Sequence, residues 1–274
     1  MNRKRLYISA DMEGVAGVTS LEQLGPKGFE YEKARAWMTN EVITACHAAF
    51  EFGVKEIVIS DSHANAQNLL LDKLPPGVQV VRAWPRPLCM MQGIEQGHFD
   101  AALLIGYHPG ASDLRGVVAH TLSLGFRELK LNGRVASESV LSAAIAGHFN
   151  VPVVMVSGDD AYTAHAQEVF PGIEAATVKW AESFTSTRTL LPKDACQLIE
   201  EKVKAALNRL EDFSPYLIEG PITVDIKASK RQNVELLDYL PLFTRTGAFE
   251  FQFEGKDIVE VSRILMFLVK NALV

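Results

Sequence analysis

The chain has 274 residues, 48% of them hydrophobic and 22% charged, with a formal net charge of −6 at pH 7. This composition is typical of a globular protein with a sizeable core, and the scattered Lys and Arg residues form no basic stripe of the kind that binds nucleic acid. The three cysteines, Cys46, Cys89 and Cys196, are odd in number and far apart. They argue against a disulfide framework and favour a reducing, cytoplasmic location.

Neither end of the sequence predicts a membrane segment. The apolar stretch 6–10, between the basic cluster and Asp11, is too short for the core of a signal peptide. The last segment, 257–274, is apolar but contains Glu260, Arg263 and Lys270. It is therefore predicted to be a packed terminal helix rather than a membrane span, and we expect no membrane partner.

Short apolar runs alternate with longer helical patterns in the first half of the chain, which is typical of a mostly parallel sheet with crossover helices. A helix is predicted over 29–53, where Gly53 is a suitable C-terminal cap. Strands are predicted over 5–10, 55–60, 78–84 and 101–107. The last of these is almost entirely apolar, as expected when helices cover both faces of a strand.

The pattern then changes to alternation over 117–136, where Asn132-Gly133 is a strong signal for a hairpin turn. Ser137 and Pro192 stand at helix starts, where a capping serine and a first-turn proline are favoured. The elements predicted after the hairpin are a helix over 137–150, strands over 152–158 and 175–181, and a helix over 192–213.

Ser, Pro and Gly residues gather around 213–221 and indicate a boundary. Beyond it, strands are predicted over 222–228 and 247–255 around a short helix, before the terminal helix. The predicted fold class is α/β: a mostly parallel sheet with flanking helices in a metal-binding core of residues 1–213. A smaller α+β C-terminal unit is predicted for residues 214–274.

Metal-capable side chains follow three of the predicted strands. Asp11 and Glu13 follow the first, His63 the second and His108 the fourth. Ligands of open α/β sheets bind beyond the carboxyl ends of the strands, so these side chains are expected to meet at one edge. Two adjacent carboxylates repel unless a cation or a shared proton lies between them. Two carboxylates and two imidazoles suit Zn²⁺, with Mn²⁺, Co²⁺ or Fe²⁺ as alternatives.

Each of these residues also has a structural interpretation. The two acids can be solvated groups at a strand end, and either histidine can be a capping or core residue; only their joint placement favours a metal. Glu138 opens a helix, where the dipole favours an acid without any function. His120, placed in the predicted hairpin strand, is either a core histidine or a general acid/base, and the pattern does not decide between them.

Asp159 and Asp160 follow the strand 152–158 and either reach the site or cap the next helix; capping is the favoured interpretation. Phosphate-binding glycine loops, the H-E-x-x-H helix and the G-x-S-x-G elbow are not found in the sequence. The remaining histidines lie in helical or loop stretches without partners and are interpreted as structural: His47, His98, His148 and His165.

An ordered set of motifs resembles the D-aminopeptidase DppA family of metallopeptidases along nearly the whole chain. The motifs are SADMEG (9–14), SDSHANAQNL (60–69), LIGYHPGAS (104–112), AHTL (119–122), LNGRVASE (131–138) and VPVVMVSGDD (151–160). The resemblance implies two zinc ions per subunit, with Asp11 bridging both. It implies that Glu13 and His108 complete the ligands of one ion, and His63 and Glu138 those of the other.

The resemblance also implies that His120 is the catalytic histidine. The implied substrates are short peptides with D-amino-acid N-termini, such as D-Ala-D-Ala, cleaved by metal-activated water in a homo-oligomer that is a decameric ring. The chain departs from the family in Ser137, which stands where a glycine often precedes the ligand glutamate, and in the segment after Lys179. Two other functions stay open: a related binuclear metallohydrolase acting on another substrate, and a non-catalytic ring scaffold stabilised by metal.

Overall fold

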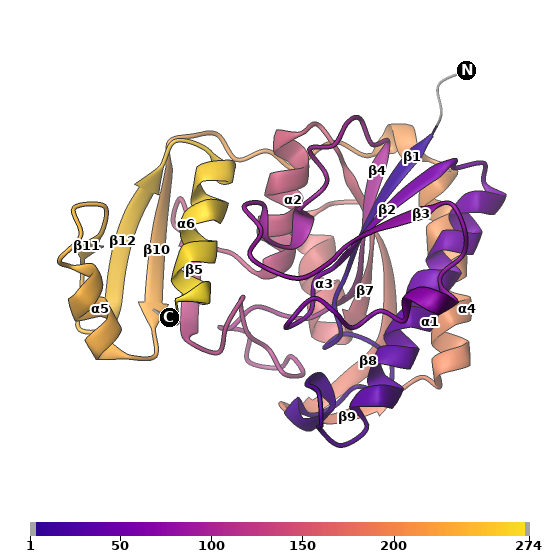
Figure 1. Ribbon diagram of the computed structural model, residues 1–274, viewed down its shortest axis with the longest axis horizontal. Coiled ribbons are helices and arrows are strands. Elements are labelled where there is room, and N and C mark those ends of the chain that lie inside the picture. Colours follow the sequence, from indigo (N-terminus) through magenta and orange to yellow (C-terminus); the bar gives the residue numbers. More distant parts are fainter. Residues whose placement is uncertain (1–3, 272–274) are drawn as a thin grey trace.

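Two β-sheets with helices beside and between them form the fold of residues 4–271, the part of the chain that this computed structural model describes (Figure 1). Within those residues the larger sheet has seven strands and the smaller has five. The larger sheet lies next to α1 (Tyr31–Glu51) and α4 (Pro192–Leu207), and the smaller sheet lies at the opposite side of the molecule.

The larger sheet is parallel except at one edge, where β9 pairs antiparallel with β8. Its strands follow the order β3 (Val78–Val81), β2 (Glu56–Asp61), β1 (Arg5–Ala10), β4 (Ala101–Tyr107), β7 (Val153–Asp159), β8 (Glu174–Ser183) and β9 (Ser186–Thr189). From β1 the chain first builds outward through β2 and β3, and then returns to the other side of β1 with β4. The sheet therefore has a topological switch point between β1 and β4.

Alternating side chains of the central strands feed two hydrophobic cores, one on each face of the larger sheet. Leu6 and Ile8 of β1 join the core formed with α1 and α4, while Tyr7 joins the core on the other face. The second core includes α2 (Glu138–His148), α3 (Asp160–Val169) and the smaller sheet. Helices thus cover both faces of the strands that deliver the predicted metal ligands.

The smaller sheet is antiparallel and joins strands from distant parts of the chain. Its order is β11 (Thr244–Arg245), β12 (Glu250–Gly255), β10 (Ile222–Ala228), β5 (Phe126–Leu131) and β6 (Arg134–Val135). Helix α5 (Arg231–Leu237) follows β10, and α6 (Ile258–Lys270) lies between this sheet and α2 (Figure 1). Short 3₁₀ turns are η1 (Leu21–Leu24), η2 (Leu71–Lys73), η3 (Cys89–Met91) and η4 (Leu210–Asp212).

The predicted fold class, a mostly parallel α/β sheet with flanking helices and further α+β structure, is confirmed. The hairpin turn is confirmed as well, because Asn132 and Gly133 adopt φ values of 48° and 77° between β5 and β6. The strand predicted from residue 117 is wrong in its first part, since β5 begins only at Phe126. The helix predicted to reach residue 213 ends at Leu207, and β9 was not predicted.

The division into residues 1–213 and 214–274 stays a prediction. Strands β5 and β6 come from the first part but pair in the sheet of the second, so the two parts share a core. The final residues of the predicted terminal helix, 272–274, lie outside the described residues. Between residues 4 and 271, no helix combines the length and the apolar character needed to cross a bilayer.

Candidate metal centre

The switch point between β1 and β4 brings two predicted ligands together. Asp11 comes directly after β1, and His108 comes directly after β4, the neighbouring parallel strand. His63 follows β2, which pairs with β1 on its other side. The crevice beyond the carboxyl ends of strands at a switch point is where α/β sheets bind ligands, so the topology itself gathers these residues.

Two glycines allow the ligand-bearing segments to approach at backbone distance. Gly14 N–H donates to the carbonyl oxygen of Gly106 at 2.7 Å. A Cβ at Gly14 would collide with the carbonyl oxygen of Tyr107, and a Cβ at Gly106, whose φ is +71°, would collide with that of Asp11. Any larger residue at either position would push the segment after β1 away from the end of β4.

The loop that presents His63 is fixed by the aspartate at the end of β2. Asp61 Oδ2 accepts hydrogen bonds from the backbone N–H groups of Asn68 at 2.6 Å and Leu69 at 2.8 Å. The Asn68 side chain donates to the carbonyl oxygen of His63 at 2.7 Å. These bonds explain the motif SDSHANAQNL in physical terms: Asp61 and Asn68 shape the loop, and His63 faces the site.

His120 lies in the loop between β4 and β5, not in a hairpin strand as predicted. Val118 and Leu122 on either side of it have φ values of 48° and 58°, a left-handed conformation that is costly for such side chains. The backbone N–H of Leu122 donates to Glu138 Oε1 at 2.6 Å, which ties the loop to the start of α2. The alternating sequence predicted extended backbone here, but the left-handed residues Val118 and Leu122 turn the chain instead.

Ser137 caps α2 as predicted, because its side chain accepts a hydrogen bond from the backbone N–H of Val140. Glu138 is the first residue of this helix and is buried. A carboxylate that only compensated the helix dipole would point to solvent, whereas this one faces two histidines. Its Oε1 lies 3.3 Å from His108 Nε2 and 3.6 Å from His120 Nε2.

Asp11 lies between two groups of ligand atoms. Its Oδ1 is 3.3 Å from His63 Nδ1, which is also 2.9 Å from Glu13 Oε2. Its Oδ2 is 3.5 Å from His108 Nε2, the nitrogen that also faces Glu138. The structure thus brings all five predicted ligands together in two triads that share Asp11, with the ligand atoms of each triad within 4.8 Å of one another.

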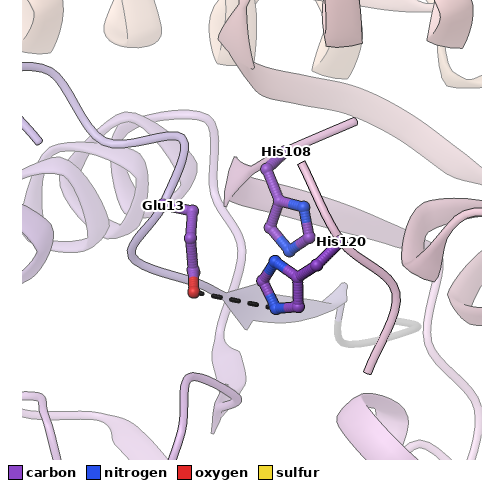
Figure 2. A group of neighbouring side chains, drawn as sticks. All are labelled: Glu13, His108 and His120. Atoms are coloured by element: carbon purple, nitrogen blue, oxygen red, sulfur yellow. Dashed lines mark ion pairs between the residues drawn. The ribbon is translucent and has the colours of Figure 1, made fainter. Parts of the chain in front are cut away.

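The predicted catalytic histidine belongs to the same cluster. The His120 ring stacks on the His108 ring with centroids 4.1 Å apart and planes 8° from parallel, and Glu13 faces His120 (Figure 2). His120 Nε2 lies 3.9 Å from Glu13 Oε1. The side chain of His120 is 17% exposed, while the other residues of the cluster are buried. His120 is therefore the member best placed to meet a molecule that enters from outside.

In each histidine of the cluster, one ring nitrogen forms a hydrogen bond with a backbone carbonyl oxygen. The bonds to carbonyl oxygens are His63 Nε2 to Leu24 at 2.7 Å, His108 Nδ1 to Pro109 at 2.9 Å, and His120 Nδ1 to Val118 at 3.0 Å. Because a carbonyl only accepts, these nitrogens hold the hydrogen, and in the neutral ring the other nitrogen presents a lone pair to the cluster. This tautomer is the one that metal-binding histidines adopt.

The electrostatics of the cluster favour a cation. Burial and then repulsion from Glu13 raise the pKa of Asp11 to about 8. Burial alone would lower the pKa of His108, but the attraction of Glu138 outweighs it and raises that pKa to about 10. The buried His108 Nε2 nevertheless has no hydrogen-bond partner. An ion such as Zn²⁺ fits this donor set, because it neutralises the carboxylates and takes the free imidazole lone pairs.

The two other predicted candidates bind backbone instead. Asp159 caps α3 by accepting from the backbone N–H of Tyr162 at 2.8 Å, which confirms the favoured interpretation, and it also accepts from Val117 N–H at 2.8 Å. Asp160 accepts from Ala181 N–H at 2.9 Å and so anchors β8. The remaining histidines take no part in the metal-capable groups found in residues 4–271: His47, His98, His148 and His165.

Lys179, which the sequence analysis did not select, holds the backbone after Asp11. This lysine of β8 is fully buried, and its Nζ donates to the carbonyl oxygens of Glu13, Val15 (3.2 Å) and Val18 (2.6 Å). A lysine in the middle of the apolar run 175–181 was the available signal, because buried lysines are rare unless they have partners. Its contacts fix the segment that carries Glu13.

A second buried charge lies beside the same segment. Glu41 of α1 is buried, and its Oε1 accepts from the backbone N–H of Ala16 at 3.0 Å, while its Oε2 has no hydrogen-bond partner. Burial raises the pKa of Glu41 to about 7, although this hydrogen bond and the nearby Lys179 oppose the shift. The segment 13–18 is therefore held by a buried ammonium group and a buried carboxyl group.

A cavity of about 160 Å³ opens over the cluster. Asp11, Glu13, His63, His120 and Glu138 line its floor. Its other walls come from distant segments and include Ala64, Trp84, Met90, Leu122, Met266, Val269 and Lys270. The cluster is thus accessible to a small molecule although most of its atoms are buried.

A parallel sheet with carboxylates and imidazoles gathered at its switch point, below an accessible cavity, defines the class of the α/β metalloenzymes. A family model described as D-aminopeptidase matches residues 4–267. The D-aminopeptidase of Bacillus subtilis (strain 168) is 31% identical over 270 residues, which cover 98% of each chain. The chain belongs to the D-aminopeptidase family, as its motifs predicted.

The solved structure of the zinc-dependent D-aminopeptidase DppA from Bacillus subtilis, a self-compartmentalizing protease, matches this chain with a TM-score of 0.92 and 30% identity. The match covers 98% of this chain and 97% of that one. The likeness therefore extends over nearly the whole of both chains.

The raised pKa of Glu41 predicts a pH-dependent stability. The unfolded chain releases this proton near pH 4.5, while the folded chain keeps it up to about pH 7, so rising pH between these values favours unfolding. Glu41→Gln removes the effect. Its free energy of unfolding relative to wild type should rise by about 2 kcal/mol between pH 5 and pH 7, as measured by urea denaturation.

Comparing the same two proteins at both pH values cancels any constant packing effect of the amide. Glu32→Gln, an exposed carboxylate of the same helix, controls for the loss of one negative charge. Parallel stability curves for wild type and Glu41→Gln across this pH range would show that Glu41 is ionised in the folded chain throughout.

Proposed function

We propose that this chain, a hydrolase of the D-aminopeptidase family, is a zinc-dependent aminopeptidase that cleaves short peptides with a D-amino acid at the N-terminus. The observation that supports it most directly is the pair of ligand triads that share Asp11 beneath an accessible cavity. Three protein ligands per ion leave a coordination position open, which is the arrangement of catalytic rather than structural zinc.

We propose that Asp11, Glu13, His63, His108 and Glu138 hold two ions per subunit, with Asp11 shared between them. One division gives Asp11, Glu13 and His63 to the first ion and Asp11, His108 and Glu138 to the second, because the atoms of each triad lie within 4.8 Å of one another. Glu13 and His108 also lie within this distance in a group with His120, so the division implied by the family resemblance, Glu13 with His108 and His63 with Glu138, has support from the same geometry. The same donors also accept Mn²⁺ or Co²⁺.

The chemistry divides between the ions and the protein. When bound, the two ions polarise the scissile carbonyl and lower the pKa of water. Asp11, shared by both triads, would contribute to holding both ions. The carbonyl oxygens that bind the outer nitrogens of His63 and His108 orient these rings, so that the ligands need no rearrangement when substrate enters.

His120 is the residue proposed to move a proton. It is the exposed member of the cluster, and the Val118 carbonyl holds its Nδ1, so Nε2 faces the reaction. From there the ring can donate a proton to the leaving amine or stabilise the oxyanion of the tetrahedral intermediate. A role for His120 as the nucleophile is the alternative within the same geometry.

The size of the cavity supports a small substrate. Its volume of about 160 Å³ is below the roughly 300–1,000 Å³ of pockets that take drug-sized ligands. A dipeptide fits this limit, and a folded protein does not. We further propose a homo-oligomer, with the decameric ring that the family resemblance implies, supported by the self-compartmentalizing relative. The free cysteines support a cytoplasmic location.

The proposed activity is tested with D-Ala-D-Ala, L-Ala-L-Ala and a phosphomonoester, each with added zinc and with a chelator. We expect zinc-dependent release of D-alanine, a much lower rate with the L-dipeptide, and no phosphate release. Preference for the L-dipeptide would contradict the stereochemical part of the proposal. If the fully zinc-loaded protein hydrolysed none of the three compounds, the metal-stabilised scaffold would be favoured.

The two-ion site predicts a zinc content of two per chain by elemental analysis. His63→Ala removes the only imidazole of the first triad and should reduce the content to about one, with loss of hydrolysis. His47→Ala, an exposed histidine of α1, is the matched control and should keep both ions. Two zinc ions in His63→Ala would exclude this residue as a ligand.

Replacement of His120 separates metal binding from proton transfer. His120→Ala should keep both zinc ions and lose roughly 10²–10⁴-fold in kcat, the usual contribution of a general acid or base. His98→Ala replaces an exposed histidine outside the metal-capable groups and controls for nonspecific effects. Turnover near that of wild type would remove His120 from the mechanism, and loss of zinc would make it a ligand instead.

A further inference from the structure

The lining of the cavity contains a tryptophan that contacts two cations. Lys270 Nζ lies 4.5 Å from the centroid of the Trp84 ring, and Arg86 Cζ lies at the same distance from it. The indole N–H donates to the carbonyl oxygen of Ala64 at 2.8 Å, which fixes the ring. Lys270, in the last turn of α6, and Trp84 both line the cavity above the metal cluster.

Among residues 4–271, neither cation forms an ion pair with a carboxylate, although Asp61 lies close enough to Arg86 to raise its pKa against the larger effect of burial. The Arg86 guanidinium donates to Ser60 Oγ and to the backbone carbonyl oxygens of Val81 and Ala83, all of which are uncharged. No hydrogen bond or ion pair joins Lys270 to an acid within the described residues. Partial burial and repulsion from Arg86 lower the pKa of Lys270, as expected of a cation without a counter-ion.

The cavity is therefore lined by groups of both charge signs. The floor holds the carboxylates and the metal-binding atoms, while the wall offers the ammonium group of Lys270. The apolar side chains of Met90, Leu122 and Met266 also line the cavity. A short peptide with free ends has a matching set of groups: an amine and a scissile carbonyl, apolar side chains and a terminal carboxylate.

We propose that Lys270, with its ammonium group positioned by Trp84, binds the free C-terminal carboxylate of the substrate. The enzyme then selects dipeptides and similarly short free peptides, because a longer or amidated chain cannot present this carboxylate within the cavity. This inference rests on the proposed aminopeptidase function and adds a substrate class to it. Arg86, each of whose three nitrogens already donates a hydrogen bond to the protein, contributes positive potential rather than a direct contact.

The test compares D-Ala-D-Ala with its C-terminal amide, which differs only in the charge of the group that Lys270 is proposed to bind. Wild type should prefer the free acid in kcat/KM. Lys270→Met should reduce this preference roughly 10–100-fold, the effect expected from losing one charge-assisted hydrogen bond, with the change mainly in KM. Lys270→Arg keeps the positive charge and should retain most of the preference.

Lys256→Met, an exposed lysine just before α6, is the matched control and should leave the acid-to-amide ratio as in wild type. An unchanged ratio in Lys270→Met would overturn the proposal. Calorimetric binding of the dipeptide and its amide to His120→Ala, with and without Lys270→Met, gives a second measurement. If wild type hydrolysed neither compound, the proposed function would fail, while these binding data would still support or reject Lys270 as the carboxylate site.

Discussion

The structure depends on one electrostatic constraint: three carboxyl groups are buried side by side at the end of a parallel sheet. Such groups cannot all be ionised without a positive partner. The pKa of Asp11 is raised for this reason, by burial and by repulsion from Glu13. The imidazoles beside them use their outer nitrogens on backbone carbonyls and present the inner ones to the same space. A divalent cation such as zinc suits both sets of groups, because it offsets the carboxylate charge and accepts the imidazole lone pairs.

Holding this cluster requires a backbone that cannot relax away from it. Gly14 and Gly106 let the segments after β1 and β4 touch, and Lys179 binds several carbonyl oxygens of the segment that follows Glu13. Glu41 binds the same segment through the backbone N–H of Ala16. Repulsion between the carboxylates is thus resisted by buried contacts outside the cluster, so the ligands are preorganised before any ion or substrate arrives.

The sequence predicted the parts of this arrangement that follow from chain order. Asp11, His63 and His108 each come just after an apolar run, so the rule that parallel strands end at one edge was enough to group them. Glu138 and His120 did not follow from pattern, because one looked like an acid in a first helical turn and the other sits between left-handed residues that alternation cannot reveal. The pairing of β5 with β10 was equally hidden, since strand partners far apart in the chain leave no local signal.

The smaller sheet contributes to the site by supporting α6. Its strands supply no metal ligand, but together with α2 they hold the helix whose last turns place Met266 and Lys270 on the wall of the cavity. The floor of the site, fixed by strand ends, determines what bond is broken, while the wall is built from Trp84, Leu122 and α6, which are separate in sequence. Because these wall residues are separate from the predicted ligands, our proposal for Lys270 assigns substrate choice to α6 and the chemistry of bond cleavage to the strand ends.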